Sequence, residues 1–598
     1  MAVNIHHTGC TFTVWAPEKA SMLLHLVEDD RLIPMQKDEK EYFSVTVEGV
    51  GQGDTYYYQP EGGKDCPDPA SHYQPLGIHG PSEVVDHDKY VWQDGAWKGL
   101  PLEEMIFYEV HAGTFTEEGT LSAAIRRLDD LVSIGINAIE LMPVCQFPGT
   151  RNWGYDGVFL YSVQNNYGGP DALKQLVDAC HQRGIAVFLD VVYNHAGEEG
   201  NYLSFFGPYF SDKYQTPWGK AFNYDGAWSD GVRAFITGNV LHWAEHYHID
   251  GLRLDAVHEI FDRNAVRIWD QLQDEVRKWG ERSGRRLYLV AESDLNSPRV
   301  VAPVELGGHG FDAQWLDDFH HSLYVLLDEK GIKHYKDFGR LEQFAKAYTE
   351  GFVHSGEWVE FRHRRHGASS AGLPGHQFVV FNQNHDLPGN RPGGQRLSML
   401  VDHDRLKLAA AAVLLSPYLP LLFMGEEYGE DAPFNFFSDH EDEKLRKELR
   451  EGRKKEFEAF EWGEDPPDPQ DEQVFLDSKL RWHKRDEGKY RELLEWHRAL
   501  IHLRRTHPLI KDLSRRRIRA DVAGANGLAV HRHSEDGRRR LLCLFNFSAD
   551  KMEYSIPYSG KWMREPVSLP AWGVAVYDLG ETSTIMLRSD AVSLLRAD

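Results

Sequence analysis

Cysteine is scarce in this chain, which holds five in 598 residues, at scattered positions and without paired spacing. That pattern predicts reduced, mostly structural thiols and no metal cluster. Long apolar runs are lacking as well, because the most apolar stretch, 408–424, is broken by Ser416, Pro417 and Pro420. A buried helix followed by a strand is therefore expected there, and not a membrane span.

Positive charge is in deficit: 66 basic side chains stand against 92 acidic ones, for a formal net charge of -26. A field of that sign repels polyanions, so a nucleic acid is not expected as the main partner, whereas a neutral substrate is unaffected. The first residues have neither a basic start nor an apolar signal core. The sequence therefore predicts a cytoplasmic protein that does not bind membranes.

The chain is too long for one hydrophobic core, so several domains are expected. Residues 1–95 alternate apolar and polar side chains between turn signals, which is typical of a small antiparallel sandwich. Over 96–515 apolar strands alternate with amphipathic helices, and over 516–598 the alternation of strands returns. We predict an α/β protein with a central (β/α)8 TIM barrel, an N-terminal Ig-like β-sandwich that resembles carbohydrate-binding domains, and a C-terminal β-sandwich.

Eight apolar segments of the central region are each expected to form one strand of a parallel barrel. They are Met105–His111, Ala138–Pro143, Ile185–Asp190, Gly251–Val257, Leu287–Glu292, Phe311–Trp315, Phe378–Phe381 and Leu419–Met424. An open doubly wound sheet fits less well, because no glycine-rich phosphate loop follows any of these strands.

Polar clusters follow four of the strands, in the stretches Asp190–His195, Gly251–His258, Val290–Asp294 and Phe381–Asp386. Each stretch begins as an apolar run and ends in carboxylate, amide or imidazole groups. A buried parallel strand has this pattern where its carboxyl end opens into a catalytic site.

Three acids in these stretches, Asp255, Glu292 and Asp386, can supply a nucleophile, a proton donor and a third charged group, as the hydrolysis of a sugar chain requires. Arg253 shares a strand face with Asp255 and should keep that carboxylate ionised. Glu292 follows an apolar run, and weak solvation should raise its pKa toward that of a general acid. Any one of them could instead be a salt bridge or a cap, but three on separate strands favour catalysis.

In this order the four stretches resemble the signature regions of the α-amylase superfamily of glycoside hydrolases, and Trp153–Asp156 resembles its Gly-Tyr-Asp element. The resemblance implies a retaining mechanism with Asp255 as nucleophile, Glu292 as acid/base and Asp386 as transition-state stabiliser. The carboxyl groups of the first two would then be about 5–5.5 Å apart. Supporting or sugar-binding roles are implied for Tyr155, Asp190, His195, Arg253, His258, His385 and Asn390.

Further segments narrow the resemblance to the branch of this superfamily that cleaves the α-1,4 bond beside the terminal trehalose of maltooligosyl trehalose. These segments are Asp68–Pro81, Glu199–Leu203, Gly207–Phe210, Tyr214–Asn223, Trp315–His321 and Gly425–Gly429. The likeness implies trehalose biosynthesis beside a maltooligosyltrehalose synthase, activity on maltooligosaccharides, and a monomer or homodimer.

Four polar residues after the sixth strand are expected to face the cleft and contact the substrate: Asp317, Asp318, His320 and His321. A structural or metal-binding role for the two histidines stays open, although no third ligand stands at zinc spacing. The region near Asp190 and His195 has no dense acidic loop for calcium. We therefore expect no required metal and no cofactor.

Three alternatives remain at this stage. A glycogen branching enzyme shares the barrel, the N-terminal sandwich and the acids, but transfers the glycosyl group to a sugar hydroxyl instead of water. An α-1,6 debranching hydrolase is a weaker alternative. A non-catalytic carbohydrate-binding barrel is the third, and it would have no need of Asp255 and Glu292 together.

Overall fold

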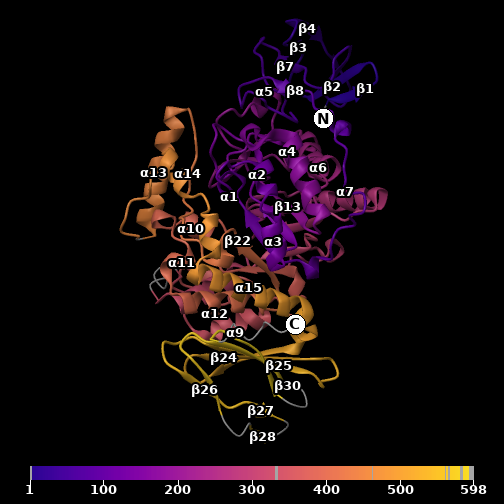
Figure 1. The fold of residues 1–598 in the computed structure, drawn as a ribbon. Helices are drawn as coiled ribbons and strands as arrows, with labels where there is room; N and C mark the ends of the chain where they lie inside the picture. Colours follow the sequence, from indigo (N-terminus) through magenta and orange to yellow (C-terminus); the bar gives the residue numbers. More distant parts are fainter. Residues whose placement is uncertain are drawn as a thin grey trace.

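The computed structural model describes residues 3–329, 335–460, 462–558, 561–562, 566–579 and 583–590. Its centre is a closed barrel of eight parallel strands, which lies between β-sheets near the two ends of the chain (Figure 1). The barrel strands are β9 (Phe107–Val110), β10 (Ala138–Leu141), β13 (Ala186–Val191), β16 (Gly251–Leu254), β17 (Tyr288–Ala291), β18 (Ala313–Trp315), β21 (Phe378–Phe381) and β22 (Leu419–Phe423). They pair in chain order, and β22 closes the ring against β9.

All eight predicted strands are confirmed, with ends that agree to within three residues. They read as apolar runs because a barrel strand is covered on both faces, by the barrel interior and by the surrounding helices. The apolar stretch 408–424 is the end of helix α12 (His403–Leu414) followed by β22, as expected. No helix of the described residues is long and apolar enough to cross a membrane. The five cysteines are free and buried.

Amphipathic helices cover the outside of the barrel, and α4 (Gly169–Gln182) shows how the sequence forms them. Gly168 and Pro170 start the helix, and its buried apolar residues recur at helical spacing as Leu173, Leu176, Val177 and Cys180. That stripe packs on β12 (Phe159–Val163) and on barrel strand β13. Helices α6 (Ser229–His246) and α7 (Ile268–Ser283) pack against each other in the same layer.

Two four-stranded antiparallel sheets form the N-terminal part of the molecule. One contains β1 (Asn4–His6), β2 (Gly9–Trp15), β6 (Tyr42–Glu48) and β5 (Gln36–Lys37). The other contains β4 (Arg31–Pro34), β3 (Met22–Leu26), β7 (Thr55–Pro60) and β8 (Ser82–Glu83). Phe12 of the first sheet contacts Tyr56 of the second, with ring centroids 4.9 Å apart, so the sheets share one apolar core.

The C-terminal part is a five-stranded antiparallel sheet of β23 (Ile518–Ala523), β24 (Gly527–His533), β25 (Arg540–Asn546), β30 (Val574–Leu579) and β31 (Ser583–Arg588). The short pair β26 (Met552–Tyr554) and β29 (Val567–Leu569) covers one of its faces through a separate apolar cluster. Buried Arg532 ties the sheet to the barrel region, because its guanidinium donates to Leu509 O at 2.9 Å. The fold is therefore the predicted TIM barrel with additional sheets at both ends.

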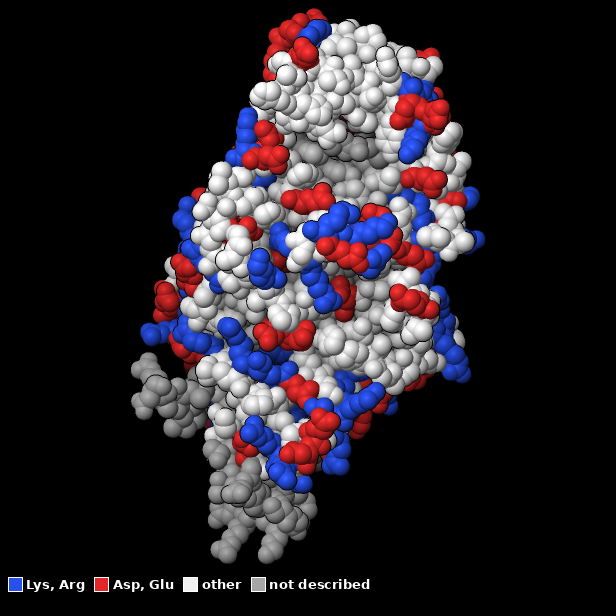
Figure 2. Space-filling model, turned by 90° about the vertical axis from the view of Figure 1, so that its right-hand side faces the viewer, with Lys and Arg blue, Asp and Glu red and all other residues white. Residues whose placement is uncertain are grey.

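Charged side chains of both signs are interspersed over the face of the molecule drawn in Figure 2. On this face the basic groups are broken up by acidic ones and form no continuous stripe, as a nucleic-acid track would require. Helix α13 (Glu443–Ala459), which stands beside the barrel at the left of Figure 1, is turned away from this view; it is also rich in charged residues and buries only Phe457.

The Gly231→Ala variant is expected to unfold at a lower temperature than the native protein. A Cβ atom at Gly231 on α6 would lie 2.1 Å from Trp15 Cε2, so the ring that docks the N-terminal sheets onto the barrel has to move. Overpacking of this kind costs about 1–3 kcal/mol. Thermal unfolding followed by circular dichroism measures the change.

The control for this test is Gly452→Ala, a helical glycine in α13 whose Cβ would meet nothing within 4 Å. Alanine should leave its unfolding midpoint unchanged or raise it, because a helical glycine is about 0.5–1 kcal/mol less favourable than alanine. Equal midpoints for the two variants would contradict the proposed contact between Trp15 and α6.

Candidate active site

The ends of adjacent barrel strands bring the predicted acids to one rim. Asp190 on β13 is in register with Arg253 on β16. The ladder continues past the strand ends, since Asp255 N donates to Val191 O and Glu292 N donates to Leu254 O, each at 3.0 Å. Asp255 and Glu292 therefore lie at the same height just past the ends of β16 and β17, and Asp190 lies two residues lower on the neighbouring strand β13.

A single buried cation, Arg253, contacts all three of these carboxylates. Its Nη1 donates to Asp190 Oδ2 at 2.7 Å and to Asp255 Oδ1 at 2.9 Å, and its Nη2 forms an ion pair with Glu292 Oε2 at 2.9 Å. The guanidinium carbon lies 4.2 Å from the ring centre of Trp315. The aromatic face and the three acids hold the guanidinium in place, and water does not reach it.

Asp255 is stabilised as a carboxylate. Burial alone would raise its pKa, but Arg253 and the amide of Asn194, which donates to Asp255 Oδ2 at 2.9 Å, bring the pKa below the ordinary aspartate value. The next residue, Ala256, has a left-handed backbone with φ of 39°. This strained geometry aims Ala256 N at Glu292 Oε2, 2.8 Å away, and so connects the two acids.

Glu292 has the opposite electrostatic character. Burial raises its pKa well above the ordinary glutamate value, Arg253 offsets only part of that rise, and the charges of Asp255 and Asp386 add to it. Around neutral pH the pair therefore holds one ionised and one protonated carboxyl group. Environments that separate the pKa values of two acids are what a nucleophile and a general acid require.

The third acid, Asp386, stands beside a charged histidine. His385 Nδ1 contacts Glu109 Oε1 at 2.6 Å, and its Nε2 lies 2.8 Å from Tyr155 Oη and 3.5 Å from Asp386 Oδ1. Burial lowers the pKa of His385, but Asp386 and Glu109 together raise it to about 9. Protonated His385 then donates to Glu109 and to Tyr155, and Tyr155 donates to Asp190 at 2.6 Å.

Asp386 is the most open of the three acids, with 40% of its side chain exposed. It borders a cavity of about 320 Å³ that also holds four residues predicted to bind substrate: Asp317, Asp318, His321 and Asn390. Asn390 Nδ2 lies 3.4 Å from Asp386 Oδ1. Burial and the neighbouring carboxylates raise the pKa of Asp317 to about 7. The rings of Tyr335, Phe338, Phe361 and Trp462 also line the cavity.

Two further predicted residues, His195 and His258, make contacts near the acids. His195 stacks on Trp218, with ring centres 5.6 Å apart, at the edge of the acid cluster. His258 Nε2 is 3.8 Å from Asp294 Oδ1 and lies behind the cluster.

Two of the four residues that were expected to contact substrate from helix α8 (Asp317–Leu327) also make contacts within the protein. Asp318 lines the cavity, but its Oδ2 accepts from Asn296 Nδ2 at 2.8 Å and from the backbone N–H groups of 353 and 354 at 2.7 and 2.9 Å, so it holds a loop. His320 is 2% exposed and stacks on Tyr324 and Phe381 beneath the cavity, because the turn of the helix points its side chain into the core.

Sequence reasoning missed several residues of this site. Glu109 could have been found from the sequence, because a lone carboxylate inside an apolar strand such as β9 indicates a buried polar contact. Asn194 lies within a signature stretch but was not singled out. Tyr335 and Trp462 come from distant segments, and no local pattern marks them. No three histidine, cysteine or acidic side chains at this rim have the spacing of a metal site; among the described residues only His72, His87 and His242 do.

Replacing Glu109 with glutamine is expected to lower the pKa of His385 from about 9 toward the ordinary histidine value near 6.5. The carboxylate contacts both the ring and the backbone N–H of His385, so its charge is a main source of the raised pKa. Histidine ¹⁵N chemical shifts recorded as a function of pH measure the change.

Glu140→Gln is the matched control, because Glu140 pairs with Glu109 across the strands and is equally buried. Burial raises the pKa of Glu140 well above the ordinary glutamate value, which favours its uncharged form, and Glu140 does not contact His385. The His385 pKa should stay near 9. An unchanged pKa in Glu109→Gln, or an equal fall in both variants, would refute the assigned cause.

Known proteins can be compared with this geometry. The family model of the alpha amylase catalytic domain matches residues 91–215. Malto-oligosyltrehalose trehalohydrolase of Saccharolobus solfataricus is 46% identical over 506 residues, which cover 85% of this chain and 87% of that protein. The protein of the same name from Mycobacterium tuberculosis is 38% identical and covers 98% of this chain and 99% of its own.

A solved structure is also similar to this chain over nearly its whole length. The crystal structure of a putative alpha amylase from Salmonella typhimurium superposes with a TM-score of 0.88 and 36% sequence identity, over 96% of this chain and 98% of that one. The likeness extends over the barrel and the sheets at both ends. The chain therefore belongs to the malto-oligosyltrehalose trehalohydrolase family, and it is a glycoside hydrolase built on the alpha-amylase barrel.

Proposed function

We propose that this protein hydrolyses the α-1,4-glucosidic bond next to the terminal trehalose of maltooligosyl trehalose and releases trehalose with retention of configuration. The proposal rests mainly on the two carboxyl groups that contact the guanidinium of Arg253. Asp255 has a lowered pKa and Glu292 a raised one, and both contact the same guanidinium. The names of the relatives support the choice of substrate.

In the first step the Asp255 carboxylate attacks the anomeric carbon while Glu292 gives its proton to the glycosidic oxygen. The carbon–oxygen bond breaks, trehalose leaves, and an ester joins the glucan to Asp255. In the second step ionised Glu292 takes a proton from water, whose oxygen attacks the same carbon and frees Asp255. Arg253 contacts both acids throughout and compensates the change in their charge.

Asp386 and its charged neighbour His385 have a different role. The exposed carboxylate of Asp386 is available for the hydroxyl groups of the sugar that carries the developing positive charge. The His385–Tyr155–Asp190 chain fixes the orientation of these groups beside Arg253. Tyr155 and His195, which faces Trp218, offer rings to the same sugar.

The cavity beside Asp386 is the proposed site for the trehalose leaving group. Trehalose is compact and presents hydroxyl groups on both rings, which suits a pocket lined by polar groups such as Asp317 and His321 and by aromatic rings. A polar pocket discriminates because its hydrogen-bonding groups stay unpaired when the wrong sugar enters. Asp318 contributes indirectly, through the 353–354 loop that it holds.

The remaining parts of the proposal concern context. We place the protein in the cytoplasm, as a monomer or homodimer that follows a maltooligosyltrehalose synthase in trehalose biosynthesis. We divide the chain into an N-terminal domain at 1–95, a catalytic domain at 96–515 and a C-terminal domain at 516–598. No cofactor is needed for the steps above, because carboxyl groups perform all the proton and glycosyl transfers.

Asp255→Ala and Glu292→Gln should each lower kcat on maltotriosyl trehalose by roughly 10⁴-fold or more, as when a covalent mechanism loses one member. Added azide should separate the roles. In Asp255→Ala, azide attacks the substrate directly and gives the β-glycosyl azide. In Glu292→Gln, assayed on an aryl maltooligoside that needs no acid, azide attacks the ester and gives the α-anomer.

Chromatography and NMR of the products measure both effects. The control is Glu535→Gln, an exposed acid of the C-terminal part that should leave turnover unchanged. Near-native turnover in either active-site variant would remove that residue from the mechanism. Transfer to a second glucan, instead of hydrolysis, would favour a branching enzyme.

Asp317→Ala and His321→Ala should reduce kcat/KM for maltotriosyl trehalose more than for maltopentaose. A lost hydrogen bond to a charged group costs about 1.5–3 kcal/mol, or roughly 10-fold to 150-fold in discrimination, and one to an uncharged imidazole such as that of His321 costs about 0.5–1.5 kcal/mol. Steady-state kinetics on both substrates give the ratio. The control Glu535→Gln, an exposed acid of the C-terminal part, should leave both values unchanged. Equal falls in the first two variants would assign them to general support.

A further inference from the structure

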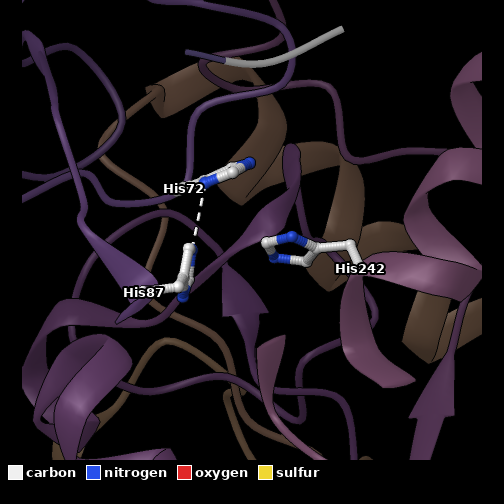
Figure 3. Close-up of side chains that lie close together, drawn as sticks. All are labelled: His72, His87 and His242. Carbon is white, nitrogen blue, oxygen red and sulfur yellow. Dashed lines mark hydrogen bonds between the residues drawn. The ribbon is translucent and has the colours of Figure 1, made fainter. Parts of the chain in front are cut away.

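Three histidines from distant parts of the chain converge outside the active site. His72 lies between β7 and β8, His87 lies between β8 and β9, and His242 lies on α6 of the barrel. One ligand nitrogen of each ring lies within 4.8 Å of the other two. Figure 3 shows the three imidazoles around a common space, with a hydrogen bond between His72 and His87.

The hydrogen bonds of these rings leave nitrogen lone pairs available. His242 Nε2 donates to Tyr161 O at 2.9 Å, which leaves Nδ1 unprotonated. His87 Nε2 and His72 Nδ1 are 3.0 Å apart and share one proton. His87 Nδ1 is buried and has no hydrogen-bond partner in the structure. The nitrogens that face each other, His87 Nε2 and His72 Nδ1, are therefore the proposed ligand atoms: a bound ion would replace their shared proton, and the second nitrogen of each ring would carry that ring's own proton.

The three rings are uncharged near neutral pH. Burial, strengthened by the neighbouring histidines, lowers the pKa of His72 to about 3 and those of His87 and His242 well below the ordinary value. Lys174, whose Nζ lies 3.3 Å from His87 O, acts in the same direction. Its own positive charge is offset by Asp86, Asp88 and Asp171.

We propose that His72, His87 and His242 bind one divalent transition-metal ion of the zinc class. Neutral imidazole is a preferred ligand of such ions, whereas Ca²⁺ and Mg²⁺ require the oxygen ligands that this group lacks. Two nitrogens of a tetrahedral zinc site are about 3.3 Å apart, given bonds of 2.0–2.1 Å. The His72–His87 pair is already near that spacing, and the ligand atom of His242 lies within 4.8 Å of the other two.

Water or His246 would complete the coordination. His246 is one helical turn from His242 on α6, and its ring stacks on His87 with ring centres 4.2 Å apart. The bound ion would join the segment that carries His72 and His87 to α6, the helix that precedes the strand of Arg253. Its effect is to stabilise this junction, and the hydrolytic acids do not touch it.

Metal binding is tested on the native protein after exhaustive treatment with a chelator and removal of the chelator. Titration calorimetry with Zn²⁺ should give one tight site per chain. Titration with Co²⁺ should give the intense visible absorption bands of a tetrahedral site, which Zn²⁺ then abolishes. Absence of a stoichiometric site in calorimetry, or only the weak bands of octahedral Co²⁺, would overturn the proposal.

Variants identify the ligands. Loss of a group that only supports a metal ligand weakens metal binding by roughly 10-fold to 100-fold. Because His72→Gln and His242→Gln each remove a ligand itself, each should weaken Zn²⁺ binding by at least that much. His79→Gln is the control, because His79 lies on the same segment, is exposed and bonds Tyr202 instead. Equal affinity in all three variants would show that the ion binds elsewhere.

Activity and thermal stability complete the test. The chelated protein and the two ligand variants should hydrolyse substrate normally at low temperature, which also demonstrates their fold. Zn²⁺ should raise the unfolding temperature of the native protein and of His79→Gln, but not that of the ligand variants. A loss of hydrolysis that Zn²⁺ restores would contradict a site separate from the chemistry.

Discussion

The candidate catalytic centre depends on the contacts that the buried guanidinium of Arg253 makes with three acidic side chains. Without it, Asp190, Asp255 and Glu292 would be three carboxyl groups crowded at one rim, and burial would favour their neutral forms. The guanidinium brings the pKa of Asp255 below its ordinary value, whereas the pKa of Glu292 stays well above the ordinary glutamate value. This difference supports the proposed roles of Asp255 as nucleophile and Glu292 as proton donor.

The barrel makes this arrangement possible, because it fixes the heights of the groups. The register between β13 and β16 places Asp190 beside Arg253. Asp255 follows Arg253 by two residues, and the backbone hydrogen bonds place Glu292 level with it at the rim. The strained backbone at Ala256 gives Glu292 an N–H group that a regular strand would not offer. Glu109, on the first barrel strand, contacts the ring of His385, which in turn lies beside Asp386.

Much of this could be predicted from the sequence, because the barrel strands are apolar runs that end in polar clusters. Arg253 and Asp255 stand two residues apart in one such run, and that spacing alone indicates a shared face. Contacts between distant segments could not be predicted. The contact between Glu109 and His385 spans 276 residues, and the orientation of His320 depends on where α8 begins. The cavity rings Tyr335 and Trp462 belong to segments without a local pattern.

The central claim is that Asp255 forms a covalent bond to the sugar while Glu292 supplies the proton. Trapping tests it most directly: Glu292→Gln is mixed with a maltooligosyl fluoride, whose leaving group needs no acid, and the digested protein is analysed by mass spectrometry. The account predicts a glucan ester on the peptide around Asp255, at that residue. An adduct on Asp386 or Asp190, or fluoride release with no adduct and inverted product, would contradict it.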